Sequence, residues 1–200
     1  MNLHTVQTVR QWQTLLDTFD TLDEAGILYF GAGHDLEEAM KPVYMDIDGK
    51  TVAFVAASRA EKNADFVIAY VHWGTEYSTV LEEAQTTTGK EYLDAGADVV
   101  IGAHPHCLQG MEYYDGKPII YSLGNFWFNS KTLDTMLIQL HFTGNNEAGQ
   151  LQATVVPAVQ TGGKTYYLNE AEEQQELYDY LESISINVVI DDDGNISEAE

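Results

Sequence analysis

Two histidines flank a proline just after an apolar segment, at positions 104 and 106. The preceding residues, 99–101, have the β-branched content of a buried strand, and Gly102 ends that strand. Pro105 disfavours the α region for His104, so we expect extended backbone, on which side chains two residues apart point to the same side. Imidazoles at the carboxyl end of a buried strand predict a metal site formed by His104 and His106. The alternative is a turn that carries two surface histidines.

A second histidine follows another apolar segment earlier in the chain. Residues 66–71 predict a buried strand, and His72 comes directly after it. A helix over about 80–95 then connects this loop to the strand before His104, which gives a βαβ unit. The carboxyl ends of parallel strands meet at one edge of a sheet, so we expect the two histidine loops to lie together.

Five side chains in and near these loops form a candidate set of nitrogen and oxygen donors: His72, Glu76, His104, His106 and Asn125. Such a set suits zinc, manganese or iron better than calcium or magnesium. Taken alone, His72 is also explained as a residue that caps its strand. Asn125 is equally well explained as a turn residue that tolerates the left-handed region.

Other residues of chemical interest have simpler explanations. Trp73 is expected to form a wall that excludes water from a pocket, and Cys107 to behave as a small buried hydrophobe. We expect His34 at the surface and a structural role for His141. The acidic run at 191–194 resembles the start of a calcium loop, but the glutamate required at the twelfth position is absent. We therefore predict a solvated turn there.

The composition indicates an acidic globular protein. Its 200 residues suit one domain, and 44% hydrophobic residues allow a sizeable core. The formal net charge is −23, which disfavours binding to nucleic acid and to anionic membranes. A single cysteine excludes an intrachain disulfide. The sequence shows neither a signal peptide nor an apolar run long enough to cross a membrane.

Apolar periodicity and turn residues predict the remaining elements. They are a helix over 11–25, a short strand over 27–30, a hairpin over 43–57, a hairpin over 111–122, strands over 133–142 and 151–159, a helix over 170–183 and a last strand over 186–190.

Several of these segments together resemble one protein family. They are HWGTEY at 72–77, Gln85, DAGADVVIGAHPH at 94–106 and IIYSLGNFWF at 119–128. The chain from about residue 15 onward is similar to the CapA family, the poly-γ-glutamate capsule synthesis proteins related to the calcineurin-like metallophosphoesterases. The resemblance implies a four-layer α/β sandwich with metal-binding loops at one edge of the sheets.

The same resemblance implies roles for particular residues. His72, His104 and His106 would bind a divalent metal (Mn, Zn or Fe), and Trp73, Gln85 and Asn125 would contact the ligand. A catalytic role would belong to His72, Glu76 and His104, in metal-dependent hydrolysis of an anionic polymer or of a small phosphoester or amide. The full-length bacterial protein would be extracytoplasmic or in the cell envelope, and any membrane association would need a segment that this chain lacks.

The chain also departs from the family pattern. The N-terminal ligand strands of the family are missing, His4 resembles a remnant of an Asn-Asn-His motif, and the connector at 58–65 is short. We therefore expect the sandwich to be incomplete on its N-terminal side, with a shortened core over 1–163 and a C-terminal helix, strand and acidic tail over 164–200. The metal could then be absent. This leaves a second function open, a non-catalytic binding or assembly module, and a homodimer is one way to complete the sheet.

Overall fold

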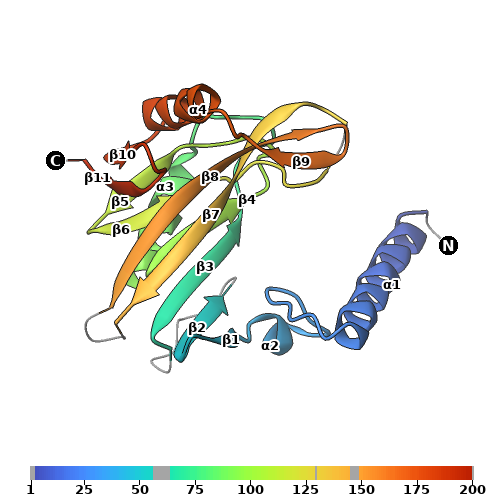
Figure 1. Cartoon of the computed structure of the whole chain (residues 1–200). Coiled ribbons are helices and arrows are strands. Elements are labelled where there is room, and N and C mark those ends of the chain that lie inside the picture. The colour runs from blue at the N-terminus through green and yellow to red at the C-terminus, as the bar shows by residue number, and fades with distance from the viewer. Residues whose placement is uncertain (1–2, 56–63, 129, 145–148, 200) are drawn as a thin grey trace.

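The computed structural model describes residues 3–55, 64–128, 130–144 and 149–199, apart from the side chains of 3–13 and 36 (Figure 1). Its helices are α1 (Leu3–Glu24), α2 (Leu36–Ala39), α3 (Glu83–Asp94) and α4 (Ala171–Ser183). Its strands are β1 (Val43–Ile47), β2 (Lys50–Val55), β3 (Phe66–His72), β4 (Val99–Ala103), β5 (Met111–Tyr114), β6 (Lys117–Ile120), β7 (Leu133–Thr143), β8 (Gln150–Thr161), β9 (Lys164–Tyr167), β10 (Val188–Ile190) and β11 (Ile196–Glu198).

The central sheet has six strands in the order β1-β2-β3-β4-β6-β5. Its four inner strands are parallel, and the hairpin partners β1 and β5 are antiparallel at the two edges. Val99 and Val100 of β4 point to opposite faces, and both are fully buried. Burial on both faces explains why the apolar run in this part of the sequence does not alternate with polar residues.

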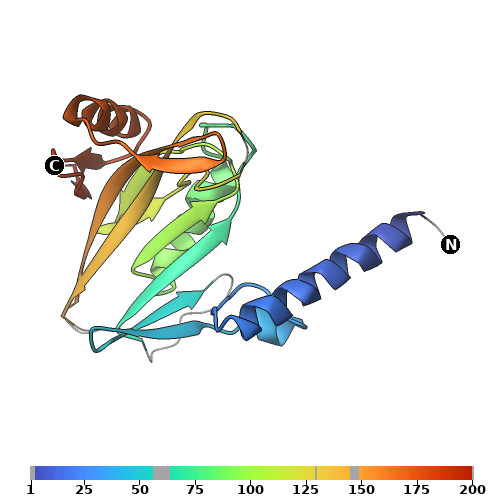
Figure 2. The ribbon, with the colours of Figure 1, turned by 45° about the vertical axis from the view of Figure 1, so that its right-hand side comes forward.

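Each face of this sheet is covered by a different layer. Helix α3 packs Leu93 against one face, in a cluster with Val100 and Ile119. The opposite face packs against the three-stranded sheet β7-β8-β9, where Ile101 shares a cluster with Val155. Figure 2 shows the two sheets stacked, with α3 behind the larger one. The predicted α/β fold of the metallophosphoesterase type is confirmed.

The C-terminal elements close one side of the sandwich. Leu181 of α4 is fully buried in the cluster between the two sheets. Ile186 donates its N–H to the carbonyl of Met111 at the β5 edge, and Val155 of β8 donates to the carbonyl of Gly194. The chain after position 163 therefore shares its core with the preceding residues.

The acidic turn between β10 and β11 is held together by its own side chains. Asp191 accepts hydrogen bonds from the N–H groups of Asp193 and Asn195 and from the Asn195 side chain. Asp191, Asp192 and Asp193 are exposed, as expected for the predicted solvated turn.

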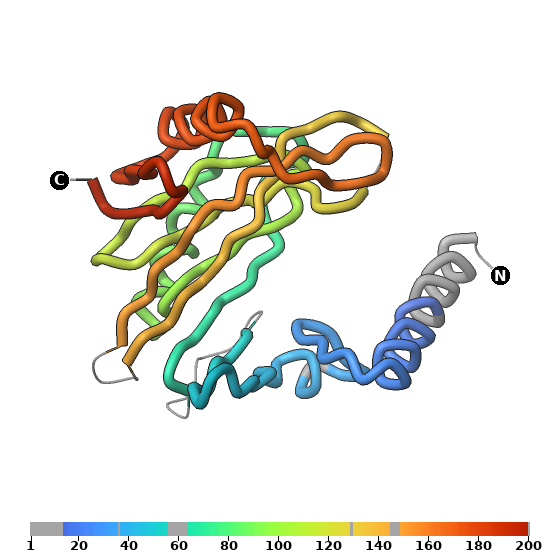
Figure 3. Tube along the Cα trace, viewed as in Figure 1, coloured from blue at the N-terminus to red at the C-terminus, as the bar shows by residue number. Residues whose placement is uncertain are grey.

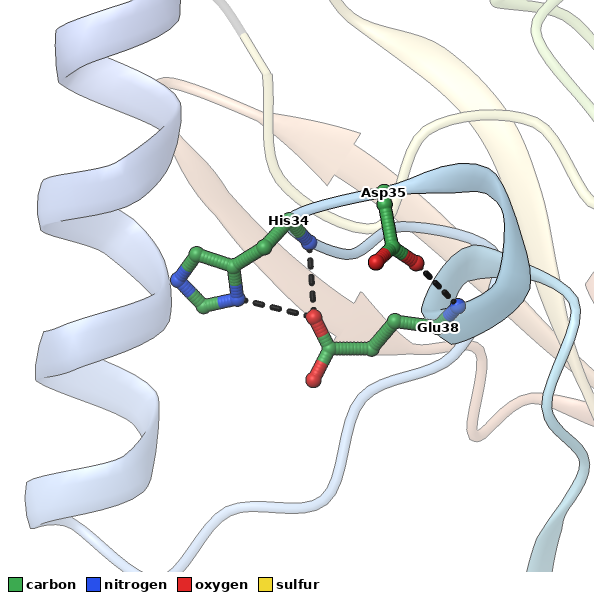
Figure 4. Close-up of polar contacts among 3 residues, drawn as sticks. All are labelled: His34, Asp35 and Glu38. Carbon is green, nitrogen blue, oxygen red and sulfur yellow. Dashed lines mark hydrogen bonds and ion pairs between the residues drawn. The ribbon is translucent and has the colours of Figure 1, made fainter.

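Helix α1 projects from the body of the molecule (Figures 2 and 3). Near its C-terminal end, the Phe19 ring stacks on Tyr29 with a centroid distance of 5.0 Å and lies 5.3 Å from the His34 ring. His34 directs its backbone N–H and its ring Nδ1 to one oxygen of Glu38, while Asp35 caps the Glu38 N–H (Figure 4). These hydrogen bonds lower the pKa of Glu38, the backbone bond most strongly. His34 is exposed, as predicted.

The structure differs from the expected elements in two places, and a third expected feature lies mostly outside the described residues. Residues 27–30 do not form a strand, because no described strand pairs with them, and Ile27 and Leu28 are more than half exposed. Strand β9 was not predicted. It has only four residues, too few to show an apolar alternation, and it pairs with the end of β8. Most of the short connector at 58–65 lies outside the described residues.

Candidate metal centre

Strands β3 and β4 bring the two histidine loops together. They pair in parallel, with His72 opposite Ala103. The backbone N–H of Trp73 donates to the carbonyl of Ala103 at 3.0 Å. Both loops therefore leave the same edge of the sheet, directly after the pair His72 and Ala103. This is the co-location that the βαβ pattern predicts.

Three side chains at this edge converge closely enough to hold one cation. Among the described residues, Glu76, His104 and His106 each offer a ligand atom, and these atoms all lie within 4.8 Å of one another. The His72 ring lies beside this group, with its centroid 4.4 Å from that of His104. Two imidazole nitrogens and a carboxylate are typical donors for zinc, manganese or iron, so the residues present fit such an ion.

The backbone of the second loop differs from the prediction. His104 has a φ of 103° and His106 a φ of 58°, so the pair does not lie on extended backbone. Proline at 105 excludes the α region for its predecessor but does not choose between the extended and positive-φ regions. The Tyr77 N–H donates to the carbonyl of Pro105 at 2.6 Å, which ties this turn to the first loop. Non-glycine residues at positive φ cost about 1–3 kcal/mol each and cluster at functional sites.

Asn125 orients one of the three candidate ligands. Its side-chain NH₂ donates to the carbonyl of His106, so its Oδ1 accepts from His106 Nδ1 at 2.8 Å. The Nε2 atom of His106 is then left for a metal, an arrangement common around metal-bound histidines. Asn125 is 6% exposed and does not have a positive φ, whereas Gly124 before it does. The turn explanation for Asn125 is therefore wrong.

The charge state of His72 is set by its surroundings. Burial lowers the pKa of His72, and the neighbouring rings of His104 and His106 lower it further. An imidazole must be neutral to bind a metal. Near neutral pH His72 is therefore in the form that a ligand or a proton acceptor requires.

The Trp73 side chain packs across β4 toward Tyr121. Its indole N–H donates to the carbonyl of Tyr121 at 2.9 Å, and its ring packs 5.7 Å from the Tyr121 ring. The indole crosses β4 at Gly102, where a β-carbon would overlap it. The indole packs against the buried cluster between the sheet and α3. Its role as a wall of a ligand pocket stays a prediction.

Gln85 lies behind the first loop and does not line the candidate site. It is 1% exposed, and its amide donates to Gln109, which is fully buried and donates in turn to the carbonyl of Ser78. Its Oε1 accepts the N–H of Glu82 at the start of α3. These bonds hold the chain at Ser78 and Glu82, directly after Glu76. The structure makes Gln85 a residue that positions this loop.

Cys107 and His141 are not part of the group of three ligand atoms. Cys107 is half-buried, burial raises the pKa of its thiol, and its Sγ lies 3.5 Å from the carbonyl of Ser78. His141 is exposed on β7, and His4 falls in α1 among the side chains that are not described.

Sequence reasoning missed an aromatic and basic border of the candidate site. The His106 ring stacks on Phe128 at a centroid distance of 4.2 Å and on Tyr77 at 5.8 Å. Lys131 places its Nζ 4.0 Å from the centre of the Tyr77 ring. The available signal was the run Phe126-Trp127-Phe128, because three consecutive large aromatics beyond the end of a buried strand predict exposed rings.

Comparison with known families identifies the chain. The profile of the bacterial capsule synthesis protein PGA_cap matches residues 4–61 and 55–130, more than half of the sequence. The chain belongs to this family. The second matched segment of this PGA_cap member contains Glu76, His104, His106 and Asn125.

Curated relatives come from several bacteria. The capsule biosynthesis protein CapA of Bacillus anthracis is 33% identical over 168 residues, covering 66% of this chain and 41% of that protein. The PGA biosynthesis protein CapA of Bacillus subtilis is 32% identical over 177 residues, covering 72% of this chain and 46% of that protein. A probable polyglutamine synthesis accessory protein of Mycobacterium tuberculosis is 30% identical over 84 residues, covering 42% of this chain and 22% of that protein.

This PGA_cap member spans less than half the length of the two CapA proteins that it matches. None of the helices in the described part of the chain has the length and apolar character needed to span a membrane.

Proposed function

We propose that this PGA_cap member acts in the biosynthesis of a poly-γ-glutamate capsule through a metal-dependent hydrolase-type site on the loops after β3 and β4. The observation that carries the proposal is the convergence of Glu76, His104 and His106 within 4.8 Å at the carboxyl ends of two parallel strands. Family membership and the printed names of the two CapA relatives supply the biological setting.

In this proposal the side chains of the site have separate tasks. His104, His106 and Glu76 hold a divalent ion, which is Mn, Zn or Fe by the chemistry of its donors. When bound, such an ion polarises the scissile bond and activates a water. Asn125 keeps the ring of His106 in place through Nδ1. His72, beside His104, completes the ligand set or moves a proton at the scissile bond.

The substrate proposed here is an anionic polymer, or a small phosphoester or amide. The cell envelope is the proposed location, since the named relatives are capsule proteins. The net charge of −23 opposes the approach of a polyanion, and a bound cation would offset that charge locally.

A second function is supported by a different observation. The matched Mycobacterium tuberculosis protein is described as an accessory protein of polymer synthesis. A non-catalytic role in binding or assembly would use the same metal to hold the two loops together, without turnover.

Hydrolysis assays on the metal-loaded protein separate the two functions. We expect cleavage of a γ-glutamyl amide or of bis-p-nitrophenyl phosphate with Mn²⁺ or Zn²⁺, abolished by a chelator and lowered about 100-fold or more in His104→Ala. His141→Ala is the matched control, because His141 is exposed on β7 and lies outside the candidate site. Stoichiometric metal without cleavage of either substrate would contradict the hydrolase and support the assembly role.

A further inference from the structure

The two edges of the central sheet differ in how they are covered. At the β5 edge, Tyr113 donates its backbone N–H to the carbonyl of Ile186, and Ile186 donates to the carbonyl of Met111. The β1 edge lies on the side of the molecule away from α4 (Figure 1), and among the described strands only β2 pairs with it. The chain therefore closes one edge of the sheet and leaves the other open.

The hairpin turn shows which backbone groups of β1 point outward. Both residues of the turn between β1 and β2 have positive φ, as in a two-residue type I′ turn. In such a hairpin Ile47 and Lys50, which flank the turn, form a hydrogen-bonded pair, and bonded and non-bonded pairs alternate from there. The N–H and C=O groups of Tyr44 and Asp46 therefore face away from β2, and no hydrogen bond from the described residues reaches them.

Strand β1 lacks the features that usually keep a sheet edge from pairing. Exposed edges are commonly protected by lysine, by proline or by a bulge that twists the strand away. The register of β1 with β2 is unbroken over its five residues, and Asp46 is its only charged residue. Tyr44 is 40% exposed, and Met45 and Ile47 are each 41% exposed, whereas β7 at the edge of the smaller sheet exposes no large apolar side chain. An apolar open edge of this kind favours pairing with another strand.

We propose that β1 pairs with β1 of a second copy of this chain, antiparallel about a twofold axis at Met45, so that the two central sheets form one continuous sheet. In this register Met45 lies opposite Met45 of the second copy. Tyr44 lies opposite the second copy's Asp46, and the reverse pair forms on the other side of the axis. All outward N–H and C=O groups of both strands are then paired.

The residues at the two ends of β1 select this register. A shift of two residues in one direction would place Asp46 opposite Pro42, which has no N–H. A shift in the other direction would place Tyr44 opposite Asp48, which belongs to the turn. The charges also suit a second copy, because Asp46 lies opposite a tyrosine rather than another carboxylate. The strand is thus complementary to itself, as the interface of a twofold dimer must be.

The same register extends the apolar layer between the two sheets. Ile47 lines an apolar cavity of about 490 Å³ together with Phe54 of β2 and Leu140 of β7. Val43 and Ile47 point to the same face of the sheet, and each lies opposite the other residue in the second copy. Because one short strand carries most of the contact, we expect a weak dimer with a dissociation constant on the order of 10 µM.

Pairing at β1 leaves the two candidate metal centres independent of each other. Because the paired β1 strands are antiparallel, strands β3 and β4 of one copy run opposite to those of the other. Their carboxyl ends face opposite edges of the joined sheet, and each centre keeps its own three ligands. The dimer therefore goes beyond the proposed function and does not depend on a bound metal.

Cysteine cross-linking tests the register. Residues opposite each other in a non-hydrogen-bonded pair have Cα atoms about 4.5 Å apart, which a disulfide can span. We expect Met45→Cys to form a covalent dimer with diamide as the oxidant, measured by non-reducing electrophoresis. Asp48→Cys is the control, because the two copies of this turn residue would lie about 20 Å apart. The proposal is overturned if Met45→Cys cross-links no faster than Asp48→Cys, or if Gln139→Cys on the β7 edge cross-links in its place.

Sedimentation equilibrium tests the dimer without a cross-link. Met45→Lys should raise the dissociation constant about 10-fold or more, since like charges directly opposite each other destabilise a strand pair. Met40→Lys adds the same charge at an exposed methionine outside β1 and should dimerise at least as well as the wild type. A chelator should leave the dissociation constant unchanged. Equal dissociation constants for the two lysine variants, a dimer lost with the metal, or a wild type that stays monomeric into the millimolar range would each overturn the β1 pairing.

Discussion

Replacing His104 or His106 by alanine is expected to lower the affinity for Mn²⁺ or Zn²⁺ by about 100-fold or more. Mutating residues that only hydrogen-bond to metal ligands already lowers metal affinity by about 10–100-fold, and a ligand itself contributes more. Each residue supplies one of the three ligand atoms that lie within 4.8 Å of one another. Metal content after dialysis, with competition against a chromogenic chelator, measures the effect.

His34→Ala and His141→Ala are matched controls for this experiment, since both residues are exposed and lie outside the group of three. They should bind metal as the wild type does. Equal metal affinity in His104→Ala and the wild type would show that the histidine pair is not part of a metal centre.

Gly102→Ala is expected to destabilise the fold by about 3 kcal/mol, the upper range for overpacking a buried site. A β-carbon at this position overlaps the carbonyl oxygen of Tyr121 and the indole nitrogen of Trp73, which are joined by a hydrogen bond. Either that bond or the β4 backbone must move. For a chain of this length the loss corresponds to a fall in Tm of roughly 10 °C, measured by thermal denaturation.

Gly89→Ala is the control for Gly102→Ala. Its β-carbon would lie 3.2 Å from the flexible Cδ1 atom of Ile119, and alanine is favoured over glycine in a helix by about 1 kcal/mol. We expect the stability of Gly89→Ala within about 1 kcal/mol of the wild type. A Gly102→Ala protein that is equally stable would mean that Trp73 does not cross β4 closely.

The sequence predicts the sheet and the position of the candidate site because both depend on local patterns. The apolar strands before His72 and His104, with a helix between them, require a parallel pair whose loops share an edge. The pairing of His72 with Ala103 confirms that inference. The fold class follows from the same alternation of strands and helices.

The geometry within the loops depends on contacts between distant residues, which a local pattern does not contain. The hydrogen bond from Tyr77 to Pro105 accompanies a turn with positive φ at His104, where extended backbone was predicted. The same turn places Glu76 within the ligand group and leaves His72 beside it.

Buried polar partners were equally hard to predict. The family resemblance implies that Gln85 contacts the ligand, yet its side chain bonds to the fully buried Gln109, which lies 24 residues away. The sequence leaves Asn125 equally well explained as a site residue and as a turn residue after Gly124, and the structure bonds its amide to His106. These side chains form their hydrogen bonds only when segments distant in the sequence have come together in the fold. The preferences of single residues therefore do not reveal such pairs.

The most direct test of the metal centre is X-ray absorption at the metal edge of the Zn²⁺-loaded protein. The convergence of Glu76, His104 and His106 predicts imidazole scattering from at least two histidines, with zinc–ligand distances of about 2.0–2.2 Å. The imidazole contribution should fall in His104→Ala and stay unchanged in His141→Ala. A first shell of oxygen atoms alone, with the same spectrum in all three proteins, would contradict a cation held by the two loops.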